Sequence, residues 1–327
     1  MDIKALFDSF KTKRIIGLGD IMLDAYMLGS VTRISPEAPV PIVSLTQEDE
    51  RLGGAANVAL NLVSLGAKAI ICSVIGKDKE GKKLIDLFHT NQISSEGLIE
   101  SDSRKTTVKT RIIGNNQQLL RIDSEQTNDI SLSEEEELFS KIESIIKTGI
   151  DALIFEDYNK GTLTASLIEK VIKLCNENNV LTTVDPKKKN FFAFQGVTLF
   201  KPNLKELKEG LDLHFSMKDF PSFENAVELL REKLKHEITF ITLSEHGVFI
   251  KNNSEKHKIA AHVRNISDVS GAGDTVISVA TLCLTAGLKI NEIAEISNLA
   301  GGLVCEKSGV VSIEKEELRL ELENLEL

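Results

Sequence analysis

Aromatic residues and net positive charge are both scarce in this sequence. There is no tryptophan, aromatic residues make up 5% of the 327 positions, and 39 Lys and Arg stand against 49 Asp and Glu, a net charge of -10. The chain therefore offers neither the basic footprint that binds a phosphate backbone nor a surface for base stacking, and nucleic acid is not an expected partner. A small anionic ligand stays open, because backbone N–H groups and a few local cations can outweigh the net charge.

Cysteine pairs and long apolar runs are also missing. The four cysteines lie far apart in apolar segments with no C-x-x-C pair, which favours buried free thiols over a zinc or redox site. No apolar run approaches the ~20 residues of a membrane span, and the first residues, MDIKALF, lack the apolar core of a signal peptide. The six histidines form neither H-x-G-H nor H-E-x-x-H, so nucleotidyltransferase and zincin signatures are absent. We expect a cytoplasmic protein with no membrane partner.

What the chain does contain is an alternation of short apolar strands with longer helical patterns. Continuous apolar strands of this kind are typical of a parallel sheet covered on both faces, so the predicted class is α/β. The expected strands are 14–18, 69–74, 152–155, 180–184, 197–200 and 239–243, and the expected helices include 55–65 and 165–175.

Two segments break this rhythm. The segment 39–45 is a short strand with prolines at its start, and 106–113 with 118–123 alternate around the turn GNNQ at 114–117 as a hairpin does. We therefore predict a small β-sheet, built from about 30–52 and 103–124, that is inserted into the main domain and acts as a lid over the strand ends. Its open edges predict pairing with a second subunit, so a homodimer is expected.

The segment 268–275, DVSGAGDT, places three small residues and one acid at the start of an apolar helical run. Backbone N–H groups of Gly271, Ala272 and Gly273 can converge on an anion there, helped by the helix dipole, and Asp274 stands where an attacking hydroxyl would arrive. An ordinary glycine turn capped by Asp fits the motif alone equally well.

Other polar groups follow the expected strands. Asp20 and Asp24 come after the first strand, where carboxylates can grip sugar hydroxyls or merely cap a turn; the third glycine of a dinucleotide fingerprint is missing at Met22, which disfavours a dehydrogenase. The segment 53–57, GGAAN, lets the backbone approach a ligand at the same edge. Asn203 and Glu206 form a capping box, and by spacing alone the cap is the favoured interpretation.

Two further segments end strands and one more is a near miss. The segments 156–161 and 185–187 recur at the same edge and argue for a common cleft, although each separately is only a loop. The segment 76–83 lacks the Ser or Thr of a Walker A loop and is interpreted as a turn before a helix.

Taken together, these motifs resemble the ribokinase-like (PfkB) sugar kinases over nearly the whole chain, which implies a single kinase domain over 1–327 with a three-layer α/β/α fold. The motifs are GGAAN at 53–57, G-x-D-x-x-G at 76–81, N-x-x-E at 203–206 and DVSGAGDT at 268–275. A narrower resemblance, to the kinases of ADP-heptose synthesis, comes from 19–24, 33–41, 53–59 and 116–121. It implies phosphorylation of D-glycero-β-D-manno-heptose 7-phosphate at its anomeric hydroxyl. Because the chain ends at Leu327 without an adenylyltransferase, we expect a kinase that stands alone.

Carried over residue by residue, the resemblance makes Asp274 the base and Gly271, Ala272 and Gly273 the anion hole. It implies ATP and Mg²⁺ as cofactors, leaves a monovalent cation open, and assigns Glu206 to the metal indirectly. The implied cofactor-binding residues are Asn203, Glu206, Ser244, Gly247, Asn298 and Gly309. The implied substrate-binding residues are Asp20, Asp24, Gly53, Gly54, Asn57, Lys109, Arg111 and Arg121.

Mild departures from the family pattern leave the acceptor less defined than the reaction: Glu156 replaces a small residue, Asn159 replaces Ala, and two further lysines follow Lys187. A kinase of another sugar, such as ribose or a fructose phosphate, remains an alternative. A regulator that binds nucleotide or sugar without catalysis is a second one.

Overall fold

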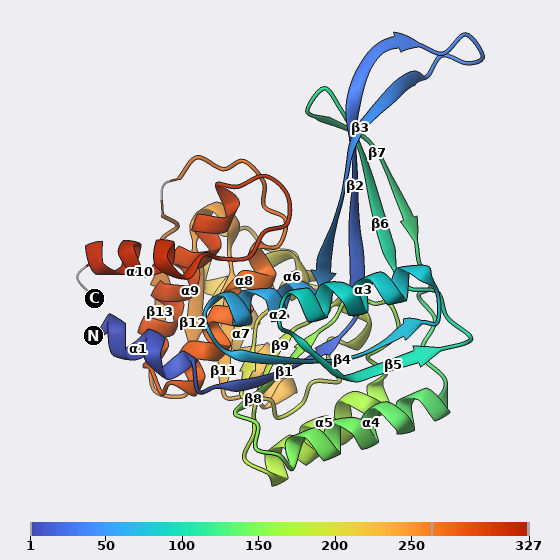
Figure 1. Ribbon diagram of the computed structural model, residues 1–327. Helices are drawn as coiled ribbons and strands as arrows, with labels where there is room; N and C mark the ends of the chain where they lie inside the picture. The colour runs from blue at the N-terminus through green and yellow to red at the C-terminus, as the bar shows by residue number, and fades with distance from the viewer. Residues whose placement is uncertain (1, 263, 326–327) are drawn as a thin grey trace.

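A nine-stranded sheet organises the computed structural model, which describes residues 2–262 and 264–325 (Figure 1). The strand order is β13-β12-β11-β10-β9-β8-β1-β4-β5, parallel throughout except for the antiparallel pairs β11–β12 and β12–β13. The strands are β1 (Arg14–Gly19), β4 (Lys68–Gly76), β5 (Ser94–Ser101), β8 (Ala152–Glu156), β9 (Leu181–Asp185), β10 (Leu199–Phe200), β11 (Ile238–Thr242), β12 (Val248–Lys251) and β13 (Lys256–Ile259).

Helices cover both faces of this sheet, and the alternation of side chains along each strand explains why. Along β1, Ile15 packs into one apolar core while Ile16 and Leu18 pack into the other, so both faces of the strand are buried. The first core is shared with α1 (Ile3–Phe10), α2 (Ala55–Ser64), α3 (Lys79–Thr90), α8 (Ala272–Thr285), α9 (Ile290–Cys305) and α10 (Lys315–Asn324). The second is shared with α4 (Leu132–Ile146), α5 (Ala165–Glu177), α6 (Leu204–Leu211) and α7 (Phe220–Leu234). The predicted three-layer α/β/α fold with a mostly parallel sheet is confirmed.

Four strands form a second sheet that projects from the main body (Figure 1). Its order is β3-β2-β6-β7, with β2 (Ile21–Ile34), β3 (Pro41–Gly54), β6 (Val108–Gly114) and β7 (Gln117–Ser124). The β6–β7 hairpin turns at Asn115 and Asn116, which both have positive φ. The strand expected at 39–45 is longer than predicted, since its polar residues pair along β2 as far as Gly54.

The path after β1 also differs from the expectation in one respect. Asp20 directly follows β1, as predicted, but Asp24 lies within β2 of the second sheet instead of at the end of the first strand. The element directly after β1 is the strand β2 and not a helix, so the strand-to-helix turn of a dinucleotide-binding fold is absent from this part of the described chain. All four cysteines are buried and free.

Within residues 2–262 and 264–325, none of the helices combines the length and the apolar character needed to cross a bilayer.

Candidate active site

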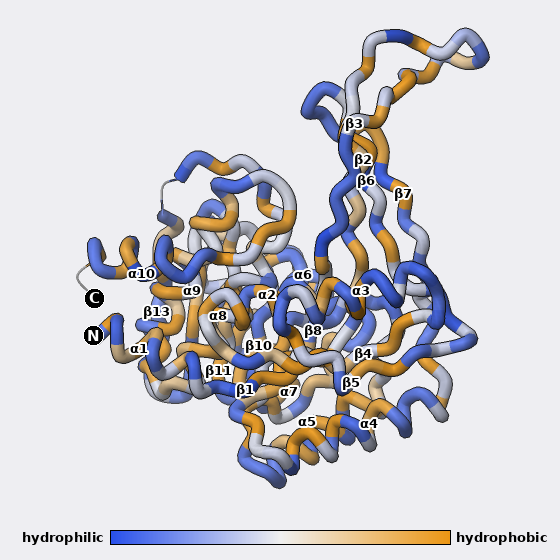
Figure 2. Tube along the Cα trace, viewed as in Figure 1, coloured by the Kyte–Doolittle hydropathy of each residue, from blue (hydrophilic) through white to orange (hydrophobic). Residues whose placement is uncertain are grey.

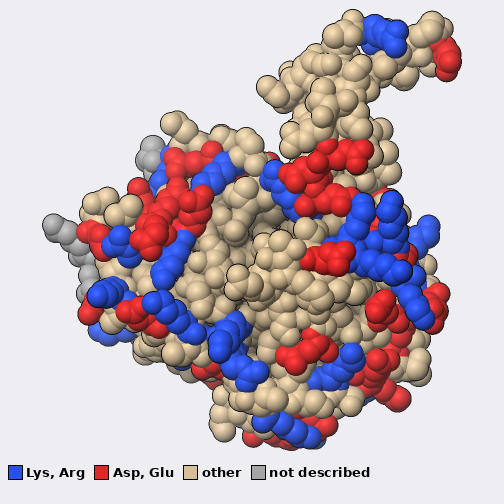
Figure 3. Space-filling view, in the orientation of Figure 1, with Lys and Arg blue, Asp and Glu red and all other residues tan. Residues whose placement is uncertain are grey.

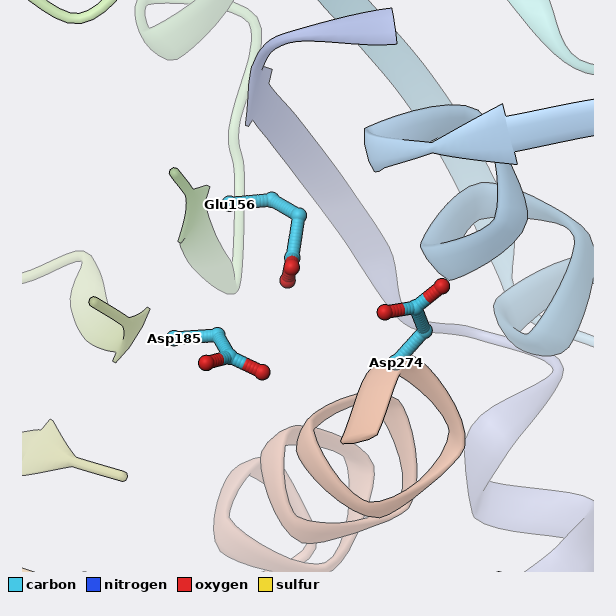
Figure 4. Close-up of side chains that lie close together, drawn as sticks. All are labelled: Glu156, Asp185 and Asp274. Atoms are coloured by element: carbon cyan, nitrogen blue, oxygen red, sulfur yellow. The ribbon is translucent and has the colours of Figure 1, made fainter. Parts of the chain in front are cut away.

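Three carboxylates meet where the parallel strands end against the start of α8 (Figure 4). Glu156 ends β8 and Asp185 ends the neighbouring β9, so the parallel pairing brings their side chains to one edge of the sheet. Asp274 reaches them from the first turn of α8. One oxygen from each of the three lies within 4.8 Å of the other two, and all three residues are buried. This is the edge at which open α/β sheets hold their ligands.

The Asp274 carboxylate is held by two hydrogen bonds. Asn57 donates its Nδ2–H to Oδ2 at 2.7 Å, and the Tyr158 hydroxyl donates to Oδ1 at 2.8 Å. Burial raises the pKa of Asp274 to about 6, against the effect of these two donors, which stabilise the ionised form. The result is a carboxylate whose proton affinity suits acid–base work near neutral pH.

The start of α8 presents backbone N–H groups beside this carboxylate, of which that of Ala272 donates to Val269 O at 3.3 Å. Gly271 is the N-cap residue, has φ of 81°, and offers no side-chain cap, so the first N–H groups of the helix have no intrahelical partner. A Cβ on Gly271 would lie 2.9 Å from Asn57 Nδ2, and one on Gly273 would lie 3.3 Å from Asp185 Oδ2. The positive φ and the short distance at Gly271 therefore disfavour a larger side chain there, whereas one at Gly273 would require Asp185 to shift slightly. The helix end is suited to an anion.

Two lysines neutralise part of the negative charge. Lys201, only 2% exposed, places its Nζ 2.7 Å from Asp185 Oδ2. Lys187 Nζ lies 3.7 Å from Asp185 Oδ1 and also binds Glu206 Oε1. Burial alone would raise the pKa of Asp185, but these two ammonium groups lower it below its ordinary value.

Glu156 stands in the same cluster without such a partner. It is 1% exposed, and its Oε2 makes no hydrogen bond within the described chain. Burial, followed by the nearby charges of Asp185 and Asp274, raises its pKa well above the ordinary value. Glu156 stands where the family resemblance implies a small residue, and the structure places its carboxylate next to that of Asp274.

The capping box predicted at the start of α6 is confirmed. Asn203 Oδ1 accepts from the Glu206 backbone N–H at 2.8 Å, and Glu206 Oε2 accepts from the Asn203 N–H at 2.8 Å. Because Lys187 links Glu206 to Asp185, the cap is also joined to the carboxylate cluster. A structural cap and a place in the site are thus compatible.

The residues expected on the nucleotide side fall into two groups. Gly247, with φ of 82°, lies so close to the end of β13 that a Cβ would meet Ile259 O at 2.0 Å, and Asn298 on α9 donates to Ala260 O at 2.7 Å. Ser244 has a φ of 54° at the start of the same turn. Next to these residues lies a cavity of about 340 Å³, lined by Glu245, His246, Lys258, Ala260 and Ala261.

Gly309 belongs elsewhere, beside the GAGD segment. Its N–H donates to Asp268 Oδ2 at 3.0 Å, and the next residue, Val310, lies close enough to Gly271 that a Cβ there would meet its side chain at 3.3 Å.

Among the residues expected to bind the sugar, Asp20 is engaged otherwise. Its Oδ2 accepts from the N–H groups of Tyr158 and Lys160 at 3.0 and 2.9 Å, and its Oδ1 accepts from Thr162 N–H at 3.0 Å. The residue is 2% exposed. Its direct contacts are with the loop after β8, which carries Tyr158.

The base of the second sheet brings several of the others together. Arg111 pairs with Asp24, and Gly53 packs so closely on Asp24 that a Cβ would lie 2.1 Å from its Oδ2. Gly54 has φ of 63° and precedes α2, which carries Asn57. Lys109 Nζ lies 5.4 Å from the centre of the Tyr158 ring.

Arg121 stands apart from this group. It lies on β7 opposite Arg111 of β6, pairs with Asp123 at 2.9 Å, and keeps 51% of its side chain exposed.

Sequence reasoning indicated a common cleft at 156–161 and 185–187 but did not single out Tyr158, Lys187 or Lys201. The sequence does contain a signal for Lys201. This lysine lies between an apolar strand and Pro202, so its ammonium group must lie at the end of that strand. No pattern in the sequence pointed to the Tyr158–Asp274 hydrogen bond, because 116 residues separate the partners.

The fold and the site define a class. A mostly parallel sheet, a glycine-rich helix start suited to phosphate, and a buried acid beside it are the parts that a phosphotransferase acting on an alcohol requires. The model of the pfkB family of carbohydrate kinases matches residues 15–317, and the chain belongs to that family. By class it is a carbohydrate kinase.

Three relatives with substantial identity are bifunctional proteins HldE. The bifunctional proteins HldE of Methylobacillus flagellatus and Aliarcobacter butzleri are 39% and 40% identical to the chain over 310 residues, covering 95% and 94% of it. HldE of Helicobacter pylori is 36% identical over 308 residues, 94% of the chain. The chain spans only 63–66% of the length of these relatives.

Solved structures with the same fold are more distant in sequence. Phosphofructokinase-2 from Escherichia coli, in complex with potassium, matches with a TM-score of 0.80 at 17% identity, covering 97% of this chain and 99% of that one. A ribokinase from Arabidopsis thaliana, complexed with ribose and ATP, matches with a TM-score of 0.72 at 15% identity, covering 95% and 98%. These similarities establish the fold.

Proposed function

We propose that the chain transfers the γ-phosphate of ATP to the C1 hydroxyl of D-glycero-β-D-manno-heptose 7-phosphate, a step toward ADP-heptose for lipopolysaccharide core precursors. The observation that carries the reaction type is the buried Asp274 carboxylate, fixed by Asn57 and Tyr158 at the start of α8, where no side chain caps the helix. The HldE relatives support the choice of acceptor.

In this proposal the protein's residues act mainly by position and charge. Asp274 accepts the proton of the attacking hydroxyl as the new O–P bond forms. The N–H groups at the start of α8, around Gly271 to Gly273, stabilise the charge on the transferring phosphoryl group. Ser244, Gly247, Asn298 and Gly309 are proposed to bind the nucleotide. Ser244 and Gly247 flank two residues that line the cavity by β13, Asn298 donates to a third, Ala260, and Gly309 is hydrogen-bonded to Asp268 of the segment that precedes Gly271.

The donor set fits a divalent cation. Three carboxylates, Asp185, Glu206 and Asp274, share two ammonium groups, Lys187 and Lys201, so negative charge is in excess even when Glu156 is neutral. Hard oxygen donors of this kind suit hydrated Mg²⁺, and Asp185 and Glu206 would hold it. When bound, the ion would neutralise charge on the phosphates of ATP.

A phosphorylated acceptor is supported by the cations at the base of the second sheet. Arg111 is committed to Asp24 and Lys160 to Glu125, whereas Lys109 has no carboxylate within 4.0 Å in the described parts of the chain. Burial lowers the pKa of Lys109, so an anion beside it would relieve a real cost. Tyr158 contacts both this lysine and Asp274, which supports an anion site near the proposed base.

The test is ATP turnover over a panel of sugars, measured as ADP release. The panel contains the heptose 7-phosphate, the same heptose without phosphate, ribose and fructose 6-phosphate. We expect strong turnover only with the first, and a ³¹P signal of an anomeric phosphate in its product. Strong turnover with ribose and none with the heptose phosphate would overturn the proposed acceptor and favour another sugar kinase.

We also propose that the second sheet acts as a lid and pairs with a second copy of the chain. Seven of the thirteen exposed large apolar side chains in the described residues lie on its two hairpins: Met27, Ile34, Val40, Leu45, Leu119, Leu120 and Ile122. Figures 2 and 3 show apolar stretches and few charges on its projecting end. Apolar surface combined with open strand edges is the pattern that self-association covers.

Light scattering at micromolar concentration tests the pairing. The wild-type chain should have the mass of a dimer, and Leu120→Asp should yield a monomer. Leu132→Asp is the matched control, because Leu132 is 78% exposed on α4, away from the second sheet. A monomeric wild type would contradict the proposal.

A further inference from the structure

The buried carboxylate of Asp20 fixes the backbone of the loop that follows β8. Asp20 accepts three backbone N–H bonds from Tyr158, Lys160 and Thr162, all between 2.9 and 3.0 Å. Such bonds to a carboxylate are charge-assisted and stronger than neutral ones. Asp20 itself follows Gly19, whose backbone runs so close to β8 that a Cβ would meet Glu156 O at 1.9 Å.

The same loop is held from its other end. Asp157 Oδ1 accepts from Asn159 N–H at 2.8 Å, and Asn159 adopts a φ of 55°. Asn190 donates to Leu163 O at 2.8 Å and to Asp157 Oδ2 at 3.3 Å. The backbone that carries Tyr158 is therefore pinned by buried side chains on both sides.

The Tyr158 side chain is held as firmly as its backbone. Its hydroxyl donates to Asp274 Oδ1, while Lys109 and Lys187 place their Nζ atoms 5.4 and 5.7 Å from the ring centre. Ammonium groups near an aromatic ring are attracted by it. With Asn57 on Oδ2 and Tyr158 on Oδ1, each oxygen of the base has one fixed donor, which sets the orientation of the whole carboxylate.

We infer that Tyr158 is a positioning residue for the base, and that Asp20 acts in catalysis only by holding the loop from which Tyr158 reaches Asp274. This inference rests on the proposed role of Asp274 and assigns Asp20 a task other than sugar contact. Precise orientation of a catalytic group governs the rate of the chemical step more than the binding of substrate. Loss of the hydroxyl should accordingly lower kcat and leave KM nearly unchanged.

The experiment compares Tyr158→Phe with Tyr26→Phe, the same change at the chain's other tyrosine. Tyr26 lies in the second sheet, and its hydroxyl is 3.5 Å from Val310 N and makes no bond to Asp274. We expect Tyr158→Phe to lower kcat about 10- to 100-fold, as the loss of a hydrogen bond to a charged group would, with KM for ATP and sugar within about threefold. Tyr26→Phe should keep kcat within about twofold.

A double-mutant cycle separates positioning from other roles. In an Asp274→Asn background, Tyr158→Phe should lower the remaining single-turnover rate by less than about twofold, because its action passes through the carboxylate. Asp20→Asn, checked for folding by its thermal transition, should show the same defect in kcat and no additional loss when combined with Tyr158→Phe.

Three results would overturn the inference: an unchanged kcat in Tyr158→Phe, additive losses in the cycle, or a rise in the sugar KM with kcat retained. The last would make Tyr158 an acceptor contact. If Asp274→Asn itself kept full activity, the proposed base would be wrong and the inference would fall with it. That outcome is distinct from a loss of the Tyr158 effect alone.

Discussion

The edge of the central sheet and the second sheet are built on opposite principles. Around Asp274 the polar groups are buried and connected. Asn57 and Tyr158 donate hydrogen bonds to Asp274, and Lys201 pairs with the neighbouring Asp185. On the second sheet several apolar side chains are exposed, and Arg121, which pairs with Asp123, keeps 51% of its side chain exposed, although the pair of Arg111 with Asp24 is largely buried. From this difference we propose that the connected core sets the chemistry, whereas acceptor choice and assembly depend on the projecting sheet.

The largest effect should follow from removing the base. Asp274→Asn keeps the shape of the side chain but cannot accept the hydroxyl proton, so kcat should fall about 10²- to 10⁴-fold. Calorimetry should show ATP binding close to that of the wild type. Asp86→Asn, an exposed acid on α3, serves as the control and should be unchanged. A variant at Asp274 that turns over normally would show that the base lies elsewhere.

The connected character of the core site predicts a large stability cost at Lys201. Replacing it by Met leaves Asp185 buried with only the more distant Lys187, and the free energy of unfolding should drop by about 3–5 kcal/mol in a urea titration. Lys205→Met is the matched control four residues on, where an 82% exposed side chain pairs with Glu209 on α6. Its cost should stay below about 1 kcal/mol. If both variants lost the same free energy of unfolding, the buried pair would contribute no more to stability than the exposed one, and the prediction would be wrong.

On the second sheet the strongest effect should come from Lys109. Its half-buried ammonium lacks an ion partner among the residues the structure describes, so Lys109→Met should raise KM for the heptose phosphate about 10- to 100-fold, as expected for one charge-assisted contact. The preference for phosphorylated over unphosphorylated heptose should shrink by the same factor. Lys109→Arg should restore part of it. Lys105→Met, an exposed lysine just before β6, should behave as the wild type.

The pH dependence of kcat should also reflect the core. Burial raises the pKa of Asp274 to about 6, and only its ionised form accepts a proton, so kcat should fall about tenfold per pH unit below that value and level off above it. Stability should move the other way: the folded state binds a proton more tightly than the unfolded one, so the contribution of Asp274 to stability falls as pH rises from about 4 to 6.

A kcat profile from pH 5 to 8 checks this. Asp157, whose pKa burial also raises to about 6, provides the control, because Asp157→Asn should leave the acid limb in place. Activity that stays level down to pH 5 would contradict the assignment.

The sequence predicted the local features of the molecule better than its long-range contacts. The strands and the α8 start followed from apolar periodicity and from glycine at 271, since both depend on neighbours in the chain. The contacts that the sequence did not predict are long-range: Tyr158 meets Asp274 only because β8 and α8 are adjacent, and Asp20, which was expected to bind sugar, faces the loop after β8 only because β1 pairs with β8. Periodicity carries no information about such pairs, so these roles came from the structure.

The smallest effect is expected at Arg121, and it sharpens the division within the second sheet itself. Arg121 was placed on the sugar side together with Lys109, yet its guanidinium is half exposed and already bound to Asp123 through two hydrogen bonds. An exposed pair of this kind contributes little, so Arg121→Met should change the free energy of unfolding by less than about 1 kcal/mol and the sugar KM by less than about threefold. The same sugar titration run on Lys109→Met and Arg121→Met decides the matter. A loss at Arg121 as large as that at Lys109 would mean that β7 moves toward the acceptor when the sugar binds, and the second sheet would then close over the site with both strands of the hairpin.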